Sequence, residues 1–488
     1  MPFAAAPLHG LPQRHAVKKG VWLAVALTLF AFVLPSTAVR AEDEQAVIAQ
    51  TGFSSANVGY LVAELATGRV LRQHRAGQAF IPASMVKLMT AYAALETLGP
   101  QFRFRTPILA TQTAGGLNLH LSGSGDPVLV QEDLAALARA LKQNVGERPV
   151  ARFTFDSNAL PHIPAIDPGD DLANSYNPPV AALSVNFNRQ WLKWERDPDH
   201  RALLVQVLPD LGHASAGVAA LRSPDGRPVQ VLFGPTTRLL IEPRIPSKGS
   251  RRVAVRSPAF RTALMFQRYA ERAGLALPLP QQQTRPVSAE IAAAVESRPL
   301  VEIAEGLLEY SNNLSAELVG LAAAKELGHT PGTLRESAAA VQQWIGTPVP
   351  PLAGKGMVWT NQSGLSGDAR LSPDALMALL WRLRNTKYGE TSFLDLLHEP
   401  RWSERDKDLM VRAKSGTMSY ARGQAGVLET KDGRQFLFVL MITDFAARSA
   451  FEKNPLRFSN PVRRQAGRWL SRARTLERGL IRHWTETL

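Results

Sequence analysis

Cysteine is absent from this chain of 488 residues. Its absence excludes a disulfide framework, a thiolate nucleophile and every zinc site built on cysteine. The ten histidines show no metal-ligand spacing and no H-E-x-x-H segment is present, so we expect neither a metal ion nor a cofactor. A G-x-S-x-G nucleophile elbow and a complete phosphate-binding loop are missing as well, which removes two competing catalytic signatures.

Long apolar runs are also lacking, because the most hydrophobic stretch, residues 21–34, contains only 14 residues. A helix needs roughly 20 apolar residues to span a bilayer. The stretch follows a basic start and precedes a series of small residues, which is typical of a secretory signal peptide. We expect cleavage after Ala41, with Ala38 as second choice, and export to the periplasm. The alternative is an uncleaved membrane anchor.

Positive charge is plentiful but unevenly placed. The formal net charge is +14, and the chain that begins after residue 41 keeps +10, because residues 1–41 hold four Lys or Arg and no acid. Residues 457–488 carry eight arginines against two glutamates. Since most of the excess lies in one terminal segment, we expect no nucleic-acid partner.

The order of strand-like and helix-like segments predicts a discontinuous domain. Residues 57–65 and 70–75 have the pattern of a hairpin, and a helix is expected directly after them. Residues 106–257 are short β-type runs with Pro and Gly turns, interrupted by one helix, and residues 258–397 are mostly helical. Strands at 409–416 and 423–443, joined by a tight turn, and a terminal helix close the chain. The simplest architecture is one α/β domain into which the β-rich block is inserted.

The helix expected from Ser84 carries a serine and a lysine on a surface that is otherwise apolar. Ser84 and Lys87 are three residues apart, so their side chains lie on the same helical face. Burial disfavours the charged ammonium and makes the neutral amine of Lys87 available as a base. The alternative is an N-cap serine beside a lysine that extends into solvent.

Two later segments place polar groups where a helix begins and where a strand ends. In YSNNLSAELVG, Ser311 and Asn313 start a helical run and suit a proton relay and an amide ligand. In VRAKSGTMSYARG, a lysine and two hydroxyls suit a carboxylate, and a glycine permits close approach of a substrate backbone. These residues are Lys414, Ser415, Gly416 and Thr417. Taken singly, each segment could be a capping turn or a polar strand end.

Together the three segments form a recognisable set. S-x-x-K, S-x-N and K-[ST]-G occur in this order in β-lactamases and penicillin-binding proteins. The chain also contains LSGSGDPVL, NPPVAALSVNFN and TNQSGLSGDARLSP, and 227 residues separate Ser84 from Ser311. With these features the chain closely resembles the class C low-molecular-mass penicillin-binding proteins, the D-alanyl-D-alanine carboxypeptidase/endopeptidase family.

The resemblance implies a penicillin-binding/β-lactamase-like α/β/α sandwich, discontinuous in sequence, with two inserted β-rich domains. We expect residues 42–107 and 258–488 to form the sandwich, and residues 108–257 to form the insertions, with about 150–230 innermost. Two features depart from the common pattern: Ser415 stands where threonine is commoner, and Asn312 where aspartate is frequent.

The resemblance also implies roles for the motif residues. Ser84 would attack the D-Ala-D-Ala carbonyl, and Lys87 would accept its proton. A relay of Ser311 and Lys414 would return the proton to the leaving amine. Asn313 would hold the substrate peptide, and the N–H groups of Ser84 and Thr417 would form the oxyanion hole. The side chains of Ser415 and Thr417 would bind the terminal carboxylate.

Substrate and inhibitor follow from the same resemblance. We expect peptidoglycan stem peptides as substrates and β-lactams as covalent inhibitors. Asp156 resembles the inserted-domain aspartate that meets the free amine of the stem-peptide diamino acid. Carboxypeptidase or endopeptidase preference and oligomeric state are left open.

Two other functions are compatible with parts of the pattern. A catalytically silent wall-binding protein could retain the fold, although the three motifs are complete. A β-lactam hydrolase is disfavoured, because the glutamate and asparagine four apart that class A β-lactamases carry are missing between Leu314 and Ala413.

The terminal segment is expected to be an amphipathic helix from Val462. Its apolar positions have helical spacing, and seven arginines are distributed around the remainder. We favour packing of its first half on the sheet. A further hypothesis places the part beyond Thr475, with Trp484, on anionic membrane or wall polymer.

Overall fold

The computed structural model describes residues 41–196, 203–208, 229–232, 238–241, 247–400, 402 and 409–488. The expected signal segment lies outside this range except for Ala41, where helix α1 (Ala41–Gln50) begins. Within the described ranges, no helix has the length and hydrophobicity needed to cross a membrane.

The main sheet is antiparallel and joins the two ends of the chain. Its strand order is β15-β16-β17-β1-β2. The bounds are β1 (Val58–Glu64), β2 (Val70–His74), β15 (Met410–Met418), β16 (Ala421–Glu429) and β17 (Gln435–Thr443). The expected hairpins are confirmed, and the predicted tight turn joins β16 to β17.

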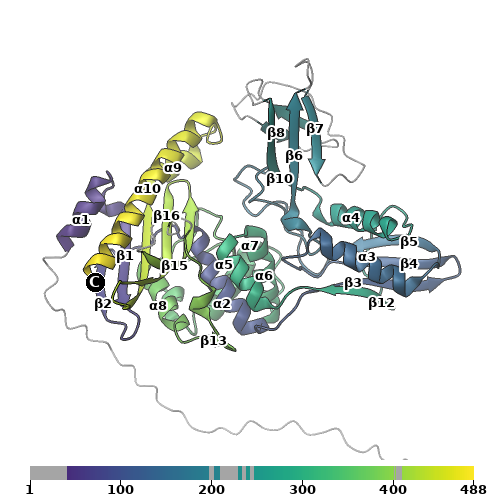
Figure 1. The fold of residues 1–488 in the computed structure, drawn as a ribbon, viewed down its shortest axis with the longest axis horizontal. Helices are drawn as coiled ribbons and strands as arrows, with labels where there is room; N and C mark the ends of the chain where they lie inside the picture. The colour runs from purple at the N-terminus through teal and green to yellow at the C-terminus, as the bar shows by residue number, and fades with distance from the viewer. Residues whose placement is uncertain are drawn as a thin grey trace, which may run out of the picture.

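The strands have side chains that alternate between two hydrophobic cores. Along β1, Val58, Tyr60 and Val62 pack toward α1 and α10 (Asn460–Thr487), whereas Leu61 and Ala63 belong to the core around α2 (Lys87–Leu98). Both faces of the sheet are therefore covered by helices, which makes the domain an α/β/α sandwich (Figure 1).

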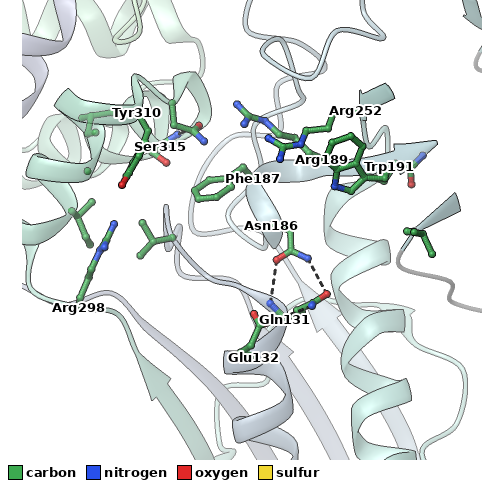
Figure 2. Close-up of a pocket in the computed structure, with 17 residues that line it drawn as sticks. Gln131, Glu132, Asn186, Phe187, Arg189, Trp191, Arg252, Arg298, Tyr310 and Ser315 are labelled. Atoms are coloured by element: carbon green, nitrogen blue, oxygen red, sulfur yellow. Dashed lines mark hydrogen bonds between the residues drawn. The ribbon is translucent and has the colours of Figure 1, made fainter. Parts of the chain in front are cut away.

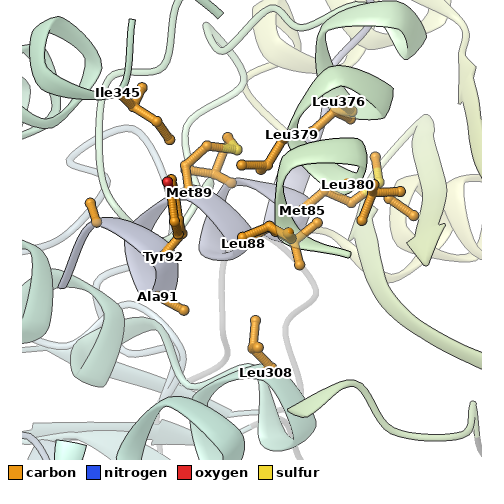
Figure 3. Close-up of a cluster of buried hydrophobic side chains, with 14 of the residues drawn as sticks. Met85, Leu88, Met89, Ala91, Tyr92, Leu308, Ile345, Leu376, Leu379 and Leu380 are labelled. Atoms are coloured by element: carbon orange, nitrogen blue, oxygen red, sulfur yellow. The ribbon is translucent and has the colours of Figure 1, made fainter. Parts of the chain in front are cut away.

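The core on the inner face is built around α2. Its buried side chains include Met85, Leu88, Met89 and Tyr92, which contact residues of the surrounding helices (Figure 3). These helices are α5 (Leu300–Tyr310), α6 (Asn313–Glu326), α7 (Leu334–Ile345) and α8 (Pro373–Leu383). Helix α9 (Phe445–Lys453) follows β17, and the hairpin of β13 (Lys387–Tyr388) and β14 (Thr391–Ser392) follows α8. Short 3-10 turns lie at Ser55–Asn57, Ala83–Val86, Asn186–Asn188, Pro350–Ala353 and Phe393–Leu396.

A second sheet projects from the sandwich (Figure 1). Its order is β11-β5-β4-β3-β12, and α3 (Gln131–Val145) and α4 (Pro258–Arg272) share its hydrophobic core. The strands are β3 (Arg105–Thr113), β4 (Gly116–Ser122), β5 (Val150–Asp156), β11 (Gln281–Gln282) and β12 (Glu290–Glu296).

The second sheet extends the inserted part beyond the expected end at residue 257. Strand β12 pairs with β3 along its length, and β11 adds to β5. The two strands are short or rich in alanine, so the sequence around them gives little strand signal. We propose residues 105–296 as the inserted part and call it the insert.

A smaller β-rich unit interrupts the insert. It contains the sheet β10-β6-β7 and the separate pair β8-β9. The strands are β6 (Arg189–Arg196), β7 (Leu203–Leu208), β8 (Val229–Leu232), β9 (Arg238–Ile241) and β10 (Lys248–Ala254).

Helix α10 packs on the sheet along its whole length, which corrects the hypothesis about its end. Trp484 is 0% exposed and lies with Leu480 and Ile481 in the core that also contains Tyr60. Trp484 therefore cannot anchor the helix in a membrane interface. The arginines of α10 lie on its exposed face: Arg463, Arg464, Arg468, Arg472, Arg474, Arg478 and Arg482.

Candidate active site

Ser84 lies in the 3-10 turn Ala83–Val86 that leads into α2. Ala83 has φ +46°, a conformation that non-glycine residues rarely adopt. This turn brings Ser84 to the edge of a cleft rather than into the core beneath it. Gly364 packs against it so closely that a Cβ there would lie 1.9 Å from the Ala83 carbonyl oxygen. Only glycine fits at that position.

Lys87 is fully buried and contacts three oxygen atoms. Its Nζ lies 2.9 Å from Ser84 Oγ, 2.8 Å from Asn313 Oδ1 and 2.6 Å from the Ser363 carbonyl oxygen. The structure therefore pairs Ser84 with Lys87, and it pairs Lys87 with Asn313 of the second motif.

The orientation of the Asn313 amide fixes the roles of these contacts. Its Nδ2 donates to the Tyr176 carbonyl at 2.9 Å, so its Oδ1 must face Lys87 as an acceptor. The Ser363 carbonyl can also only accept. A neutral amine would use its two N–H groups on these acceptors and leave its lone pair for the Ser84 hydroxyl. The geometry is therefore that of an amine ready to accept the serine proton.

Electrostatics favour that neutral amine. Burial lowers the pKa of Lys87 well below its ordinary value, and the nearby charge of Lys414 lowers it further. Glu317 acts in the opposite direction, but it does not outweigh the other two effects. The direction agrees with a lysine that serves as a base near neutral pH.

Glu317 and Ser363 are site residues that the sequence analysis did not identify. The Glu317 carboxylate accepts hydrogen bonds from the N–H groups of Gln362 (3.0 Å) and Ser363 (2.9 Å). It thereby holds the carbonyl that Lys87 contacts. The sequence did contain a signal for Glu317. It is a lone carboxylate in the apolar run of α6, four residues after Asn313 and on the same helical face.

The third motif lies on β15, the edge strand of the main sheet next to the Ser84 turn. Burial, followed by the charge of Arg422, lowers the pKa of Lys414 to about 7. Its Nζ donates to the Ser415 carbonyl at 3.2 Å, and the described chain shows no hydrogen bond between Lys414 and Ser311.

Glycine is needed at position 416 for a different reason from the one expected from the sequence. A Cβ at Gly416 would lie 2.2 Å from the Pro82 carbonyl oxygen. The glycine therefore lets the strand approach the chain just before Ser84, which places the third motif beside the nucleophile.

The three motifs meet in one cleft of about 660 Å³. Its lining includes Ser84, Ser311, Asn313, Ser415 and Thr417. Ser415 and Thr417 are two residues apart on a strand, so their side chains lie on the same face, and both line the cleft. A serine nucleophile with a buried amine, and two hydroxyls at the end of a strand, together suit acyl transfer from a substrate that carries a carboxylate.

The family model of D-Ala-D-Ala carboxypeptidase 3 (S13) matches residues 41–456. The chain belongs to this family. Its reaction class is accordingly that of a serine D-Ala-D-Ala carboxypeptidase.

Relatives agree with this assignment. The D-alanyl-D-alanine carboxypeptidase of Actinomadura sp. strain R39 is 27% identical over 451 residues, which cover 80% of this chain and 79% of that protein. The structure of penicillin-binding protein 4 from Haemophilus influenzae has a TM-score of 0.68 at 19% identity, and covers 82% of this chain and 93% of that chain. Its complex with a β-lactam has a TM-score of 0.63 at 20% identity, with coverages of 79% and 90%. The structural matches confirm the predicted penicillin-binding/β-lactamase-like fold.

In this S13 carboxypeptidase, Asp156 does not lie in the catalytic cleft. It ends β5, is 3% exposed, and accepts hydrogen bonds from His120 (2.7 Å), Ser122 (2.8 Å) and the Asn158 N–H (3.0 Å). Burial raises the pKa of Asp156, but these hydrogen bonds outweigh it and hold the pKa below its ordinary value. A carboxylate that is already hydrogen-bonded inside the insert has a structural role, which argues against the expected contact with a substrate amine.

A buried ion pair connects the third motif to α10. Arg422 Nε and Nη2 donate to the Glu477 carboxylate at 2.6 and 2.7 Å, and Arg422 Nη1 donates to the Thr417 hydroxyl. Arg422 lies opposite Thr417 in the pairing of β16 with β15. The terminal helix therefore positions a hydroxyl that lines the cleft.

We expect Glu477→Gln to destabilise the sandwich domain and to slow acylation together. Breaking a buried ion pair leaves the remaining charge uncompensated and costs about 3–5 kcal/mol. At roughly 2–4 °C for each kcal/mol, Tm should fall by more than about 6 °C. Glu486→Gln, exposed on the same helix, is the matched control and should leave Tm and acylation unchanged. Equal melting curves for the two variants would contradict a structural role for the pair.

Proposed function

We propose that the enzyme cleaves D-Ala-D-Ala stem peptides through an ester on Ser84. The observation that carries the proposal is the Lys87 amine, 2.9 Å from Ser84 Oγ, with both of its other contacts to obligate acceptors. In its neutral form the amine gives its two N–H groups to these acceptors, so its lone pair is left to accept the Ser84 proton.

The first half of the reaction forms the ester. Ser84 Oγ attacks the carbonyl carbon of the penultimate D-Ala as its proton passes to Lys87. The N–H groups of Ser84 and Thr417 stabilise the oxyanion. Asn313 orients the substrate peptide, while Ser415 and Thr417 bind the terminal carboxylate.

The second half releases the products. Ser311 and Lys414 return a proton to the departing amine, the C–N bond breaks and D-Ala leaves. Water then hydrolyses the ester and restores Ser84.

A direct assay tests the proposed function. The wild-type protein is incubated with a peptide that ends in D-Ala-D-Ala, and released D-Ala is measured before and after treatment with penicillin. We expect release that stops as the protein becomes acylated. Release that continues at the full rate after complete acylation would contradict the proposal, and absence of both release and acylation would favour a catalytically silent wall-binding protein.

We further propose that Asp170 takes the role first assigned to Asp156. Asp170 belongs to the insert and lines the catalytic cleft. Its Oδ1 accepts hydrogen bonds from the Asp171 N–H (2.6 Å), the Asn174 amide (3.3 Å) and the Tyr176 hydroxyl (3.4 Å), whereas its Oδ2 accepts none within the described chain. Burial raises the pKa of Asp170, and a substrate ammonium would offset that cost by pairing with the free oxygen.

Asp170→Asn is expected to lower kcat/KM for peptides with a free side-chain amine by roughly tenfold to a hundredfold, because a hydrogen bond to a charged group is worth about 1.5–3 kcal/mol. Penicillin acylation should change little, since penicillin lacks that amine. The control is the same peptide with its side-chain amine acetylated, which the variant and the wild type should cleave equally. Equal losses on both peptides would show that Asp170 has only a structural role.

Export to the periplasm is proposed on two grounds. The family acts on a cell-wall substrate, and residues 1–41 have the composition of a signal peptide. Peripheral contact with anionic membrane or wall polymer remains a prediction, which now rests only on the exposed arginines of α10.

A further inference from the structure

A second cavity lies on the other side of the second motif. It has a volume of about 890 Å³ and is enclosed by α5 and α6 on one side and by the insert on the other (Figure 2). Tyr310 and Asn312 line this cavity, whereas Ser311 and Asn313 line the catalytic cleft. The turn between α5 and α6 is therefore a wall that both cavities share.

The second cavity is rich in guanidinium groups. Arg189, Arg252 and Arg298 line it, together with a single acid, Glu132. Arg189 Nε donates to the Ser175 carbonyl at 2.7 Å, and the Arg252 guanidinium lies 4.4 Å from the centre of the Trp191 ring. In the described part of the chain, neither Arg189 nor Arg252 has a carboxylate partner.

The stacking of Arg252 matters for what it can bind. A guanidinium that lies over an aromatic face keeps the N–H groups at its edge available for an acceptor. Burial lowers the pKa of Arg189, and the charge of Arg252 lowers it further, so the two cations repel each other across the cavity. An anion placed between them would relieve that repulsion.

The backbone that carries these groups is strained. Asn186, Phe187 and Asn188 have φ values of +52°, +58° and +53°. A left-handed conformation costs most non-glycine residues roughly 1–2 kcal/mol, and asparagine adopts it more readily than phenylalanine, so the strain is greatest at Phe187. Hydrogen bonds hold the turn in place: Asn188 Nδ2 donates to the Pro179 carbonyl and the Asn186 N–H donates to the Leu129 carbonyl.

The strained turn shapes the cavity. It directs the Phe187 ring between Arg189 and Trp191 on one side and Tyr310 on the other (Figure 2). Tyr310 is 69% exposed and presents a second aromatic surface. Strain of this kind persists where the surrounding structure fixes it, and such residues cluster at ligand sites.

We propose that this cavity binds a carboxylate-bearing segment of the peptidoglycan substrate that lies away from the scissile bond. Arginines pair with carboxylates in two-point geometry, and the rings of Phe187 and Tyr310 suit the apolar faces of sugars or side chains. The proposal rests on the proposed function, because it concerns the same substrate.

Because the two cavities share a wall, binding in the second cavity should affect the affinity for polymeric substrate. A polymer that occupies both cavities is held at two places, so the second contact forms at a high effective concentration. A short peptide reaches only the catalytic cleft. The second cavity should therefore strengthen binding of polymer without affecting short peptides or penicillin.

Charge reversal at Arg252 tests the proposal. In a Ser84→Ala background, binding to insoluble peptidoglycan is measured by co-sedimentation for Arg252→Glu and for the control Arg152→Glu. Arg152 is exposed on β5 of the insert and does not line the cavity, so the control makes the same change in net charge. We expect at least a tenfold weaker affinity for Arg252→Glu and no change for the control.

The same substitutions with Ser84 intact check the fold. Penicillin acylation and cleavage of a short D-Ala-D-Ala peptide should match the wild type for both variants. If the wild type fails to cleave the short peptide, the proposed function is wrong. Sedimentation with peptidoglycan does not require cleavage, so it tests the second cavity separately.

Two outcomes would overturn the proposal. One is that Arg252→Glu sediments no less than the Ser84→Ala parent or loses no more than Arg152→Glu, so that the cavity arginine has no specific effect. The other is competition by inorganic phosphate as strong as that by a soluble muropeptide, which would identify a general anion site.

Discussion

Replacement of Lys87 by arginine is expected to slow acylation by penicillin by about 10²–10⁴-fold, the range that a general base contributes. The guanidinium stays protonated at any relevant pH and cannot accept the Ser84 proton. Its planar guanidinium also differs in shape from the amine, whose three contacts are with Ser84, Asn313 and Ser363. The measurement is the second-order rate of acylation, followed by intact mass.

The pH dependence of the wild-type rate extends this prediction. The neutral form of Lys87 increases as pH rises through its pKa, and that pKa lies well below the ordinary value. The acylation rate should therefore rise with pH and level off below the range in which an exposed lysine titrates. Lys325→Arg, at an exposed position of α6, is the control and should keep the wild-type rate and profile. An active Lys87→Arg variant with an unchanged profile would contradict the assigned base.

Replacement of Ser84 by alanine is expected to abolish both acylation and release of D-Ala while the fold is retained. The Ser84 hydroxyl makes its hydrogen bond with Lys87, and loss of one such bond costs about 1 kcal/mol. Lys87 keeps its contacts with Asn313 and Ser363. The melting temperature should change by only a few degrees, at roughly 2–4 °C for each kcal/mol. A large loss of Tm would mean that lost activity reports unfolding instead of chemistry.

Much of the site could be predicted from the sequence because its key contacts are local or occur in short motifs. Ser84 and Lys87 meet through helical spacing, and the residues of the third motif alternate along one strand. Glu317 and Ser363 were missed because their contact joins α6 to a loop far away in the sequence. The lone carboxylate of Glu317 in an apolar helical run was a local signal, but no local pattern shows which distant loop it contacts.

The errors have a common physical origin, which is that composition does not show what covers a side chain. Asp156 ends a strand and could have faced a ligand, but His120 and Ser122 on the neighbouring strand donate hydrogen bonds to it. Trp484 has the spacing of an amphipathic helix, but its apolar stripe faces the sheet and not a membrane. In both cases tertiary packing decided the outcome.

The position of the penicillin adduct tests the central claim most directly. Wild-type protein is treated with penicillin and digested with trypsin, and the adduct is located by mass spectrometry. Cleavage after Arg75 and Lys87 releases the peptide 76–87, in which Ser84 is the sole hydroxyl-bearing residue. We predict one adduct per chain, on this peptide. An adduct on a peptide that contains Ser311, Ser415 or any other serine, with peptide 76–87 unmodified, would contradict the assignment of Ser84 as the nucleophile.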